Sequence, residues 1–406
     1  MNIIIANTSA YPNIGGVETS ITSFAKELIN MGHNVVIFCM QLSPSEPIEI
    51  MHEGIKIVRE PITNSKFPFL ATSALIKSAA VGFAKIAESF KPDFVWSNQT
   101  MITLAIRNSG YTGKLIQLFP TTASMNCKGL LKQNRGLPLS QKIINFLKYP
   151  ISYLKQSRME SKILKICTPV VFSQNMVKNL QRKHKSLPEC NLIRPSLEKE
   201  KFCPEIADSQ LDEIKSSYNL SKTDNIILYA GRLSVAKNLF LLLDSFRLLQ
   251  QNFSSNSKLV LVGNGPAENN LRKYSQKIGI SEKVIFAGPQ MKLLPVFFRI
   301  AKLSVLPTFI ESFGLVLLES LAVGTPAIGF KYNGREVLTA THEIIDDGIT
   351  GKIIETPTAQ ALANGMHDIL KLNNDEYHKM QHACIANIEN NYSWNSFCKK
   401  MLDISI

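Results

Sequence analysis

Short apolar runs recur along the chain and alternate with longer segments that have helix-like spacing of apolar positions. Each run has three to five residues, mostly Ile, Val, Leu and Phe, which suits a buried strand. In the first half the runs are Ile3–Ala6, Val35–Phe38, Ile55–Val58, Phe94–Trp96, Leu115–Leu118 and Pro169–Phe172. The series restarts with Ile226–Tyr229, Lys258–Val262, Val284–Phe286, Leu303–Leu306, Ala327–Gly329 and Gly351–Ile354. Repeated strand–helix units of this kind predict parallel α/β sheets.

The restart of the series predicts two domains, each a doubly wound, Rossmann-like parallel sheet. A length of 406 residues also favours two domains over one. We place the link at Leu192–Glu205, where two prolines interrupt a charged stretch. The expected domains are therefore residues 1–198 and 199–385, followed by a helical tail at 386–406.

The net charge of +13 lies almost entirely in the first half of the chain. Residues 1–200 carry 24 Lys and Arg against 12 Asp and Glu, and Lys128–Lys165 has nine basic residues and one acid, Glu160. Such a basic field suits an anionic membrane surface or a nucleic acid, and a merely solvated face is the alternative. Apolar residues interleave with these cations: Leu130, Leu131, Ile143, Phe146, Leu147, Tyr153 and Leu154. We therefore expect a peripheral, reversible contact with anionic membrane.

The cysteines point to a reduced compartment. Seven are scattered along the chain, an odd number and never in C-x-x-C spacing, which argues against a disulfide framework or a zinc site. The start of the chain, NIIIAN, resembles a strand and not a signal peptide, and no run of 18 apolar residues predicts a transmembrane helix. We expect a cytoplasmic protein, placed at the inner face of the cell membrane if the basic stretch binds there.

The most informative motif is PTFIESFGLVLLESLAVGTPAIGF, in which Glu311 and Glu319 bracket a helix that begins near Gly314. A glycine at a helix start lets phosphate approach the free amides, where the helix dipole also favours an anion. Two carboxylates can then hold polar groups on either side of that phosphate. Eight helical residues would separate them by about 12 Å, roughly the span from sugar to ribose in a sugar nucleotide.

The segment ESFGLVLLE resembles the paired-glutamate, E-x7-E, signature of retaining glycosyltransferases of family 4, which have the GT-B fold of two Rossmann-like domains facing a cleft. The resemblance implies that Glu311 contacts the transferred sugar and Glu319 the ribose hydroxyls. It also implies that the helix amides at Phe313, Gly314 and Leu315 hold the diphosphate of the donor.

Further motifs of the same family appear along the chain. The resemblance of GRLSVAK implies that Arg232 and Lys237 neutralise the leaving diphosphate. The turn GGVE, with Gly15 and Gly16, resembles the loop that faces the donor diphosphate.

Two turns of the second half also resemble the family. GNGP, with Gly263 and Asn264, matches its G-x-G-P turn, and Pro289 follows a strand whose loop usually cradles the nucleobase. In this family the last helix returns to the N-terminal domain. The segment FPTTASMN, however, has no histidine where many members carry one.

The resemblance implies transfer of a hexose-type sugar from a nucleoside-diphosphate sugar to a hydroxyl of a glycan or lipid-linked glycan, as in bacterial surface polysaccharide or lipopolysaccharide assembly. We expect no cofactor and no metal, since no D-x-D carboxylate pair stands out.

Three other functions are alternatives. A glycoside hydrolase would need two carboxyls facing each other across one bond. A GT-B epimerase acting on sugar nucleotides would turn over without an acceptor. A basic nucleic-acid binder would prefer RNA to a uridine sugar, but no aromatic-rich basic platform supports it, and we expect no nucleic-acid partner.

Overall fold

The computed structural model describes residues 1–13, 16–62, 71–119, 121–123, 125, 139–184, 189–197, 202, 206–253 and 256–405. The chain divides into two compact units. Unit 1 comprises Met1–Ala123, Tyr153–Ser196 and Trp394–Ile406, and unit 2 comprises Ser124–Ser152 and Leu197–Ser393. The division at Ser196 lies close to the expected boundary after residue 198. The segment that returns to unit 1 begins at Trp394, later than the expected residue 386.

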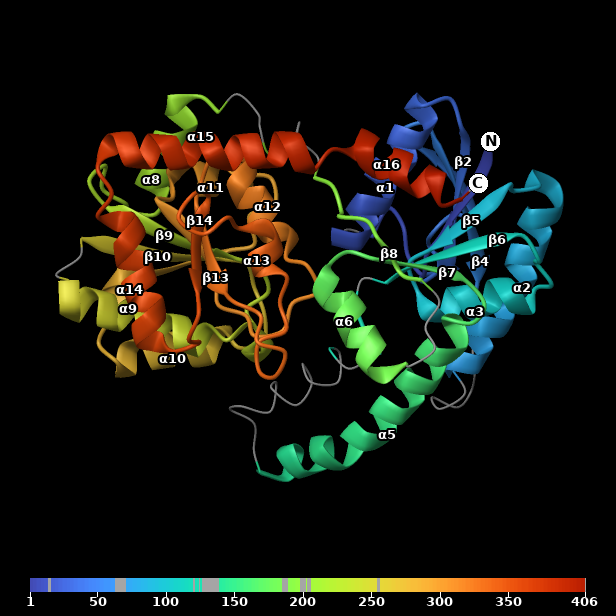
Figure 1. The fold of residues 1–406 in the computed structure, drawn as a ribbon, viewed down its shortest axis with the longest axis horizontal. Helices are drawn as coiled ribbons and strands as arrows, with labels where there is room; N and C mark the ends of the chain where they lie inside the picture. Colours follow the sequence, from blue (N-terminus) through green and yellow to red (C-terminus); the bar gives the residue numbers. More distant parts are fainter. Residues whose placement is uncertain are drawn as a thin grey trace. The chain divides into compact units, whose positions relative to one another are not determined.

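Unit 1 contains a sheet of eight strands in the order β3-β4-β2-β1-β5-β6-β7-β8 (Figure 1). Its neighbouring strands are parallel except β3, which is antiparallel to β4. Because the chain passes from β1 to β2 on one side and later to β5 on the other, the strand order reverses between β1 and β5. In sequence order the strands are β1 Asn2–Ala6, β2 Asn34–Gln41, β3 Glu49–His52, β4 Ile55–Pro61, β5 Phe94–Ser97, β6 Lys114–Phe119, β7 Thr168–Val171 and β8 Asn191–Leu192.

Aromatic packing brings the C-terminal helix α16, Trp394–Asp403, into the core of unit 1. The ring of Phe24 on α1, Gly16–Asn30, lies 4.5 Å from Trp96 and 5.1 Å from Phe397. The opposite face of the sheet is covered by α2, Ala71–Phe90, and α3, Thr100–Asn108. The other described helices that contribute to unit 1 are α6, Gln174–Lys183, and the part of α5, Leu139–Ile163, that begins at Tyr153; the earlier part of α5 belongs to unit 2.

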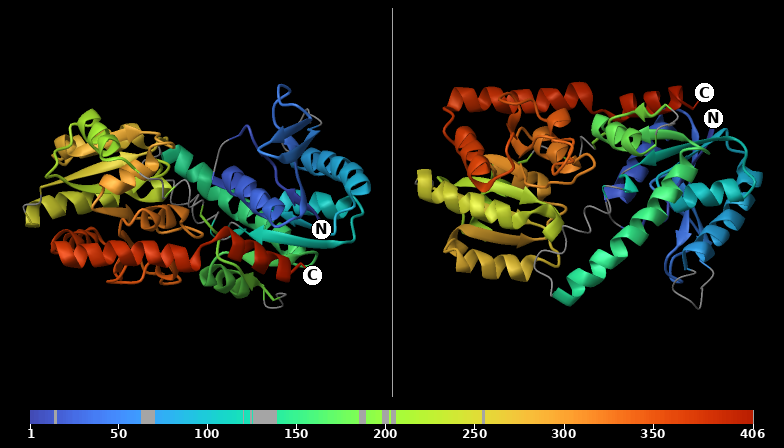
Figure 2. Two further views of the ribbon diagram at one scale, coloured as in Figure 1. Left: turned by 90° about the horizontal axis from the view of Figure 1, so that it is seen from above. Right: turned by 60° about the horizontal axis from the view of Figure 1, so that its bottom comes forward.

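Unit 2 contains a sheet of six parallel strands in the order β11-β10-β9-β12-β13-β14. The order reverses between β9 and β12, and helices lie on both faces of the sheet (Figure 2). In sequence order the strands are β9 Asn225–Ala230, β10 Ser257–Val262, β11 Val284–Gly288, β12 Leu303–Leu306, β13 Ala327–Phe330 and β14 Gly351–Ile354. The two sheets confirm the predicted fold class of two doubly wound α/β domains.

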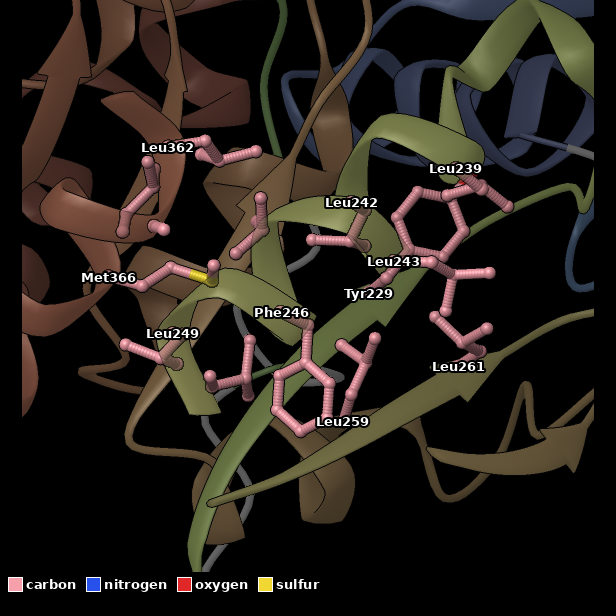
Figure 3. Packing of buried hydrophobic residues seen from close by; sticks show 14 of the residues in the cluster. Tyr229, Leu239, Leu242, Leu243, Phe246, Leu249, Leu259, Leu261, Leu362 and Met366 are labelled. Atoms are coloured by element: carbon pink, nitrogen blue, oxygen red, sulfur yellow. The ribbon is translucent and has the colours of Figure 1, made fainter. Parts of the chain in front are cut away.

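The core of unit 2 forms because α9, Leu239–Phe253, carries an apolar stripe. Its buried positions recur every three or four residues, as a helix requires to cover a sheet with one face. Leu242 and Phe246 of this stripe pack over Leu259 of β10. Met366 of α14, Ala359–Leu370, belongs to the same core cluster (Figure 3). The other described helices of unit 2 are α8 Asp208–Ser217, α10 Glu268–Lys277, α11 Leu294–Ile300, α12 Leu315–Ala322, α13 Thr341–Ile344, α14 Ala359–Leu370 and α15 Asn374–Asn391, with short 3₁₀ turns η2 Val235–Lys237 and η3 Ser281–Lys283.

Candidate functional site

The strongest candidate site lies in unit 2, where the strand order reverses. β9 and β12 are parallel neighbours, with Ile227 opposite Leu303, so the loops that follow them leave the same edge of the sheet. The loop after β9 carries Arg232 and Lys237, and the loop after β12 carries Glu311. In open α/β sheets, ligands bind in the crevice that such a reversal leaves between neighbouring loops.

An ion pair joins these two loops. Lys237 Nζ lies 2.5 Å from Glu311 Oε2, and the two side chains are only 28% and 21% exposed. The neighbouring Asn238 adopts a left-handed conformation with φ of 58°, and its side-chain amide donates to the Pro307 carbonyl at 3.1 Å. The loops are therefore held together at two adjacent points. The sequence motifs indicate roles for Lys237 and Glu311 but do not predict the contact between them.

Tyr229 supports the same loop from inside the sheet. Its buried hydroxyl donates to the Arg232 carbonyl at 3.1 Å, which leaves the Arg232 side chain exposed beyond the strand end. Burial, with a smaller contribution from the negative charge of Glu311, raises the pKa of Tyr229 well above its usual range. The hydroxyl thus stays protonated and remains a donor to the arginine loop.

Glycine allows the loops after β9 and β10 to approach each other. Gly263 has φ of +131°, and a Cβ at this position would lie 2.0 Å from the Gly231 carbonyl oxygen. Asn264, exposed at the turn, accepts a hydrogen bond from the Leu233 amide through its carbonyl at 2.8 Å. Pro289 is exposed just after β11 at the same edge of the sheet. The predicted residues after β9, β10 and β11 therefore line adjacent strand ends.

Helix α12 begins as the glycine motif predicts. Gly314 is the N-cap residue with φ of 102° and ψ of 60°, and Leu315 is the first helical residue. Phe313 is buried, which anchors the turn. Glu319 lies inside the helix, but Glu311 lies in the segment before it, so the helical rise of about 12 Å does not describe their separation. The Leu317 amide donates to the Gly314 carbonyl at 2.9 Å, so the amides that precede Leu317 at the start of α12 are the ones that can bind an anion.

The glycine turn of unit 1 is described only in part. Gly16 begins α1, whereas Gly15 lies outside the described residues. Around this turn, Ser9 Oγ donates to Glu18 Oε1 at 2.5 Å, and Thr8 Oγ1 donates to Gln99 Oε1 at 2.5 Å. The first bond ties the loop after β1 to helix α1, and the second ties the loops after β1 and β5, which flank the reversal of strand order in unit 1.

The predictions about metal, disulfides and membrane concern other parts of the chain. Within the described ranges, no group of three or more His, Cys, Asp or Glu is placed to hold a metal ion. Cys39, Cys167, Cys190, Cys384 and Cys398 are free thiols; Cys127 and Cys203 lie outside the described residues.

The basic stretch Lys128–Lys165 is visible only from residue 139, where α5 begins. Residues 128–138 lie outside the described part of the chain. On α5, Ile151 and Leu154 are 71% and 53% exposed. No helix in the described part of the chain combines the length and apolar character needed to cross a bilayer.

Two family models match the chain. Residues 210–391 match Glycosyl transferases group 1, and residues 14–115 match Glycosyltransferase Family 4. Together with the two parallel-sheet units, these matches define the class of the protein as a glycosyltransferase of GT-B fold.

Individual relatives are distant. The alpha-monoglucosyldiacylglycerol synthase of Streptococcus pneumoniae is 26% identical over 377 residues, which cover 91% of this chain and 76% of that protein. Sucrose-phosphate synthase of Thermosynechococcus elongatus has a TM-score of 0.79 at 17% identity, covering 99% of this chain and 98% of that chain. Anabaena HepE, solved in complex with UDP-glucose, has a TM-score of 0.73 at 13% identity, covering 99% and 98%. The two solved structures share the fold of this chain.

Proposed function

We propose that this protein is a retaining glycosyltransferase that moves a hexose-type sugar from a nucleoside-diphosphate sugar to a hydroxyl group of a glycan or lipid-linked glycan. The observation that carries the proposal is the Lys237–Glu311 ion pair, 2.5 Å long, at the reversal of strand order in unit 2. A cation for phosphate and a carboxylate for the sugar are thereby held side by side, and Glu311 lies just before the start of α12.

In this proposal the leaving diphosphate is neutralised by three kinds of group. Arg232 and Lys237 supply positive charge, and the amides at the start of α12, around Phe313–Leu315, supply oriented dipoles. Preorganised groups of this kind stabilise the charge that develops on the leaving oxygen without reorganising during the reaction. The proposed mechanism therefore uses no metal ion and no cofactor.

The two glutamates take different roles in the proposed mechanism. Glu311, placed before α12 and held by Lys237, contacts the transferred sugar and stabilises the positive charge that develops on it. Glu319, inside α12, accepts hydrogen bonds from the ribose hydroxyls. The turns at Gly263–Asn264 and Pro289 then enclose the rest of the nucleotide.

The relatives suggest where to begin with substrates. HepE is described in complex with UDP-glucose, and the Streptococcus pneumoniae relative is named as a glucosyldiacylglycerol synthase. On this basis we propose a UDP-hexose donor; the resemblance of the sequence motifs supports the proposal of a surface polysaccharide or lipopolysaccharide intermediate as the acceptor. The basic stretch Lys128–Lys165 would bring the enzyme to the inner face of the membrane where such acceptors reside.

A donor screen followed by a stereochemical assay tests the proposal. Thermal shift with UDP-, GDP- and ADP-sugars should show stabilisation by one nucleotide class, because a ligand that binds only the folded state raises the melting temperature. NMR of the sugar released early in donor turnover should then show the α anomer from an α-linked donor. Release of the β anomer would contradict retention, and conversion of the donor to an isomeric sugar nucleotide without acceptor would indicate an epimerase. No response to any sugar nucleotide would refute the proposed substrate class.

A further inference from the structure

The loop after β13, residues 331–340, is unusual because one side chain organises its backbone. Oδ1 of Asn333 accepts hydrogen bonds from the amides of Arg335, Glu336 and Val337 at 3.0, 3.0 and 2.9 Å. The amide of Asn333 donates in turn to the Val337 carbonyl at 3.2 Å. Asn333 therefore closes the exposed half of the loop on itself, and an alanine at this position would leave three amides without their acceptor.

The second half of the loop is bonded directly to the segment that carries Glu311. The Leu338 amide donates to the Phe309 carbonyl at 2.6 Å, and the Leu338 carbonyl accepts from the Glu311 amide at 3.1 Å. These two bonds form a parallel bridge between Leu338 and Ile310. The backbone of Glu311 is thus fixed by the loop, while its carboxylate is fixed by Lys237.

Burial makes this connection stiff. Val337 and Leu338 are both 0% exposed, and Val337 belongs to the same core cluster as Phe309 and Phe330. The rings of Phe309 and Phe330 lie 5.4 Å apart in an edge-to-face arrangement. Because close-packed interiors transmit strain, a change in the loop is passed to Glu311.

We propose that Asn333 is a positioning residue that sets the place of Glu311 through the bridge at Leu338. The inference rests on the proposed function, in which Glu311 acts on the transferred sugar. Misplacing a reacting group by about 1 Å can cost on the order of 100-fold in rate. We expect Asn333→Ala to lower kcat by about 10- to 100-fold. The affinity for nucleoside diphosphate should fall far less than kcat, because Arg232 and Lys237 lie in a loop that is also held by the separate contacts of Tyr229 and Asn238.

The experiment compares three full-length variants with the wild type. Asn333→Ala removes the acceptor, and Asn333→Asp keeps an oxygen acceptor for the three amides. Asn256→Ala is the matched control, because Asn256 is an exposed asparagine of unit 2 whose side-chain amide donates a long, 3.3 Å bond to the Thr223 carbonyl. For each protein, turnover of UDP-glucose and calorimetric binding of UDP are measured. The same two measurements are made in parallel with a GDP-sugar and GDP, and with an ADP-sugar and ADP.

The expected pattern is a selective loss of kcat in Asn333→Ala, most of it restored in Asn333→Asp, with wild-type behaviour in Asn256→Ala. Wild-type kcat in Asn333→Ala would overturn the inference, and so would a loss of UDP affinity in proportion to kcat. Amide hydrogen exchange provides a second measurement, which should show faster exchange at Leu338 and Glu311 in Asn333→Ala; unchanged exchange there would also overturn it. If the wild type turns over no sugar nucleotide, the proposed function fails, and the exchange data still decide whether Asn333 holds the bridge.

Discussion

Replacing Glu311 by glutamine should separate catalysis from nucleotide binding. The substitution keeps the size of the side chain but removes the charge that lies 2.5 Å from Lys237 Nζ. In the free protein, Lys237 is then no longer held in an ion pair. A nucleoside diphosphate would also meet one negative charge fewer at the site. Both effects favour binding of UDP. The transferred sugar, in contrast, loses the Glu311 carboxylate that would stabilise its developing positive charge.

The size of the effect follows from the burial of the pair. Exposed ion pairs contribute about 0–1 kcal/mol, and hydrogen bonds to charged groups contribute about 1.5–3 kcal/mol. With side chains 28% and 21% exposed, the Lys237–Glu311 pair lies between these cases, and we take a net value of about 1–2 kcal/mol. If the wild type must break this ion pair to bind UDP, it loses this free energy on binding, whereas Glu311→Gln does not. The variant should therefore bind UDP about 5- to 30-fold more tightly. Turnover should fall by about 100- to 1,000-fold, the usual effect of deleting one electrostatic contact to the transition state.

Calorimetric titration with UDP and steady-state turnover of UDP-glucose measure the two quantities on the same preparation. Lys237→Met is the partner variant and should weaken UDP binding instead of tightening it. In the double variant the two effects on UDP affinity should not add, since each substitution already breaks the same pair. Equal losses of UDP affinity and turnover in Glu311→Gln would refute the reasoning, because they would assign Glu311 to ground-state binding of the nucleotide.

Three further predictions concern other features of the molecule. Arg232→Ala and Glu319→Ala should each weaken UDP binding by about 10- to 150-fold, the effect of losing one charged hydrogen bond, and unchanged calorimetric affinity in both variants would remove the proposed nucleotide site. Burial raises the pKa of the Cys39 and Cys167 thiols from 9.0 to about 12. The unfolded chain therefore loses these protons first, so the free energy of unfolding should fall as pH rises from about 9 towards 12, and urea unfolding should show a shallower fall in Cys39→Ala and Cys167→Ala. Through Lys128–Lys165 the protein should sediment with phosphatidylglycerol vesicles at low salt and be released at high salt; equal sedimentation with neutral vesicles would show that this stretch is only a solvated face.

The strands of both sheets were largely predictable because most of them are buried and apolar along their length. β12 and β14 have the predicted bounds, and the other predicted strands differ by a few residues at their ends. The sequence prediction missed β3 and β8. β3, Glu49–His52, alternates between exposed and half-buried positions, and β8 has only two residues, so neither has an apolar run.

The sequence motifs name the residues of the candidate site but do not predict the contacts between them. Short motifs identify Arg232, Lys237 and Glu311, since each follows an apolar run and the carboxyl ends of parallel strands share one edge. The ion pair between Lys237 and Glu311 joins residues that are 74 positions apart in the sequence. The two residues come together because β9 lies beside β12, a strand order that the motifs do not specify. The role of Asn333 in the loop after β13 was not predicted either. Its side chain accepts three backbone hydrogen bonds because of the local backbone geometry, which the residue type alone does not specify.

The return of α16 to unit 1 has a consequence for the order in which the chain acquires structure during synthesis. The indole of Trp96 donates at 3.2 Å to the hydroxyl of Ser405, a residue 309 positions further along the chain, and Phe397 packs on the ring of Phe24. On the ribosome, nascent unit 1 lacks helix α16, which completes its core, until all of unit 2 has emerged. The usual rule that the N-terminal domain finishes folding first is therefore reversed for this chain. Unit 2 can complete its fold while unit 1 still exposes apolar surface. We therefore expect chaperones to bind the nascent N-terminal half.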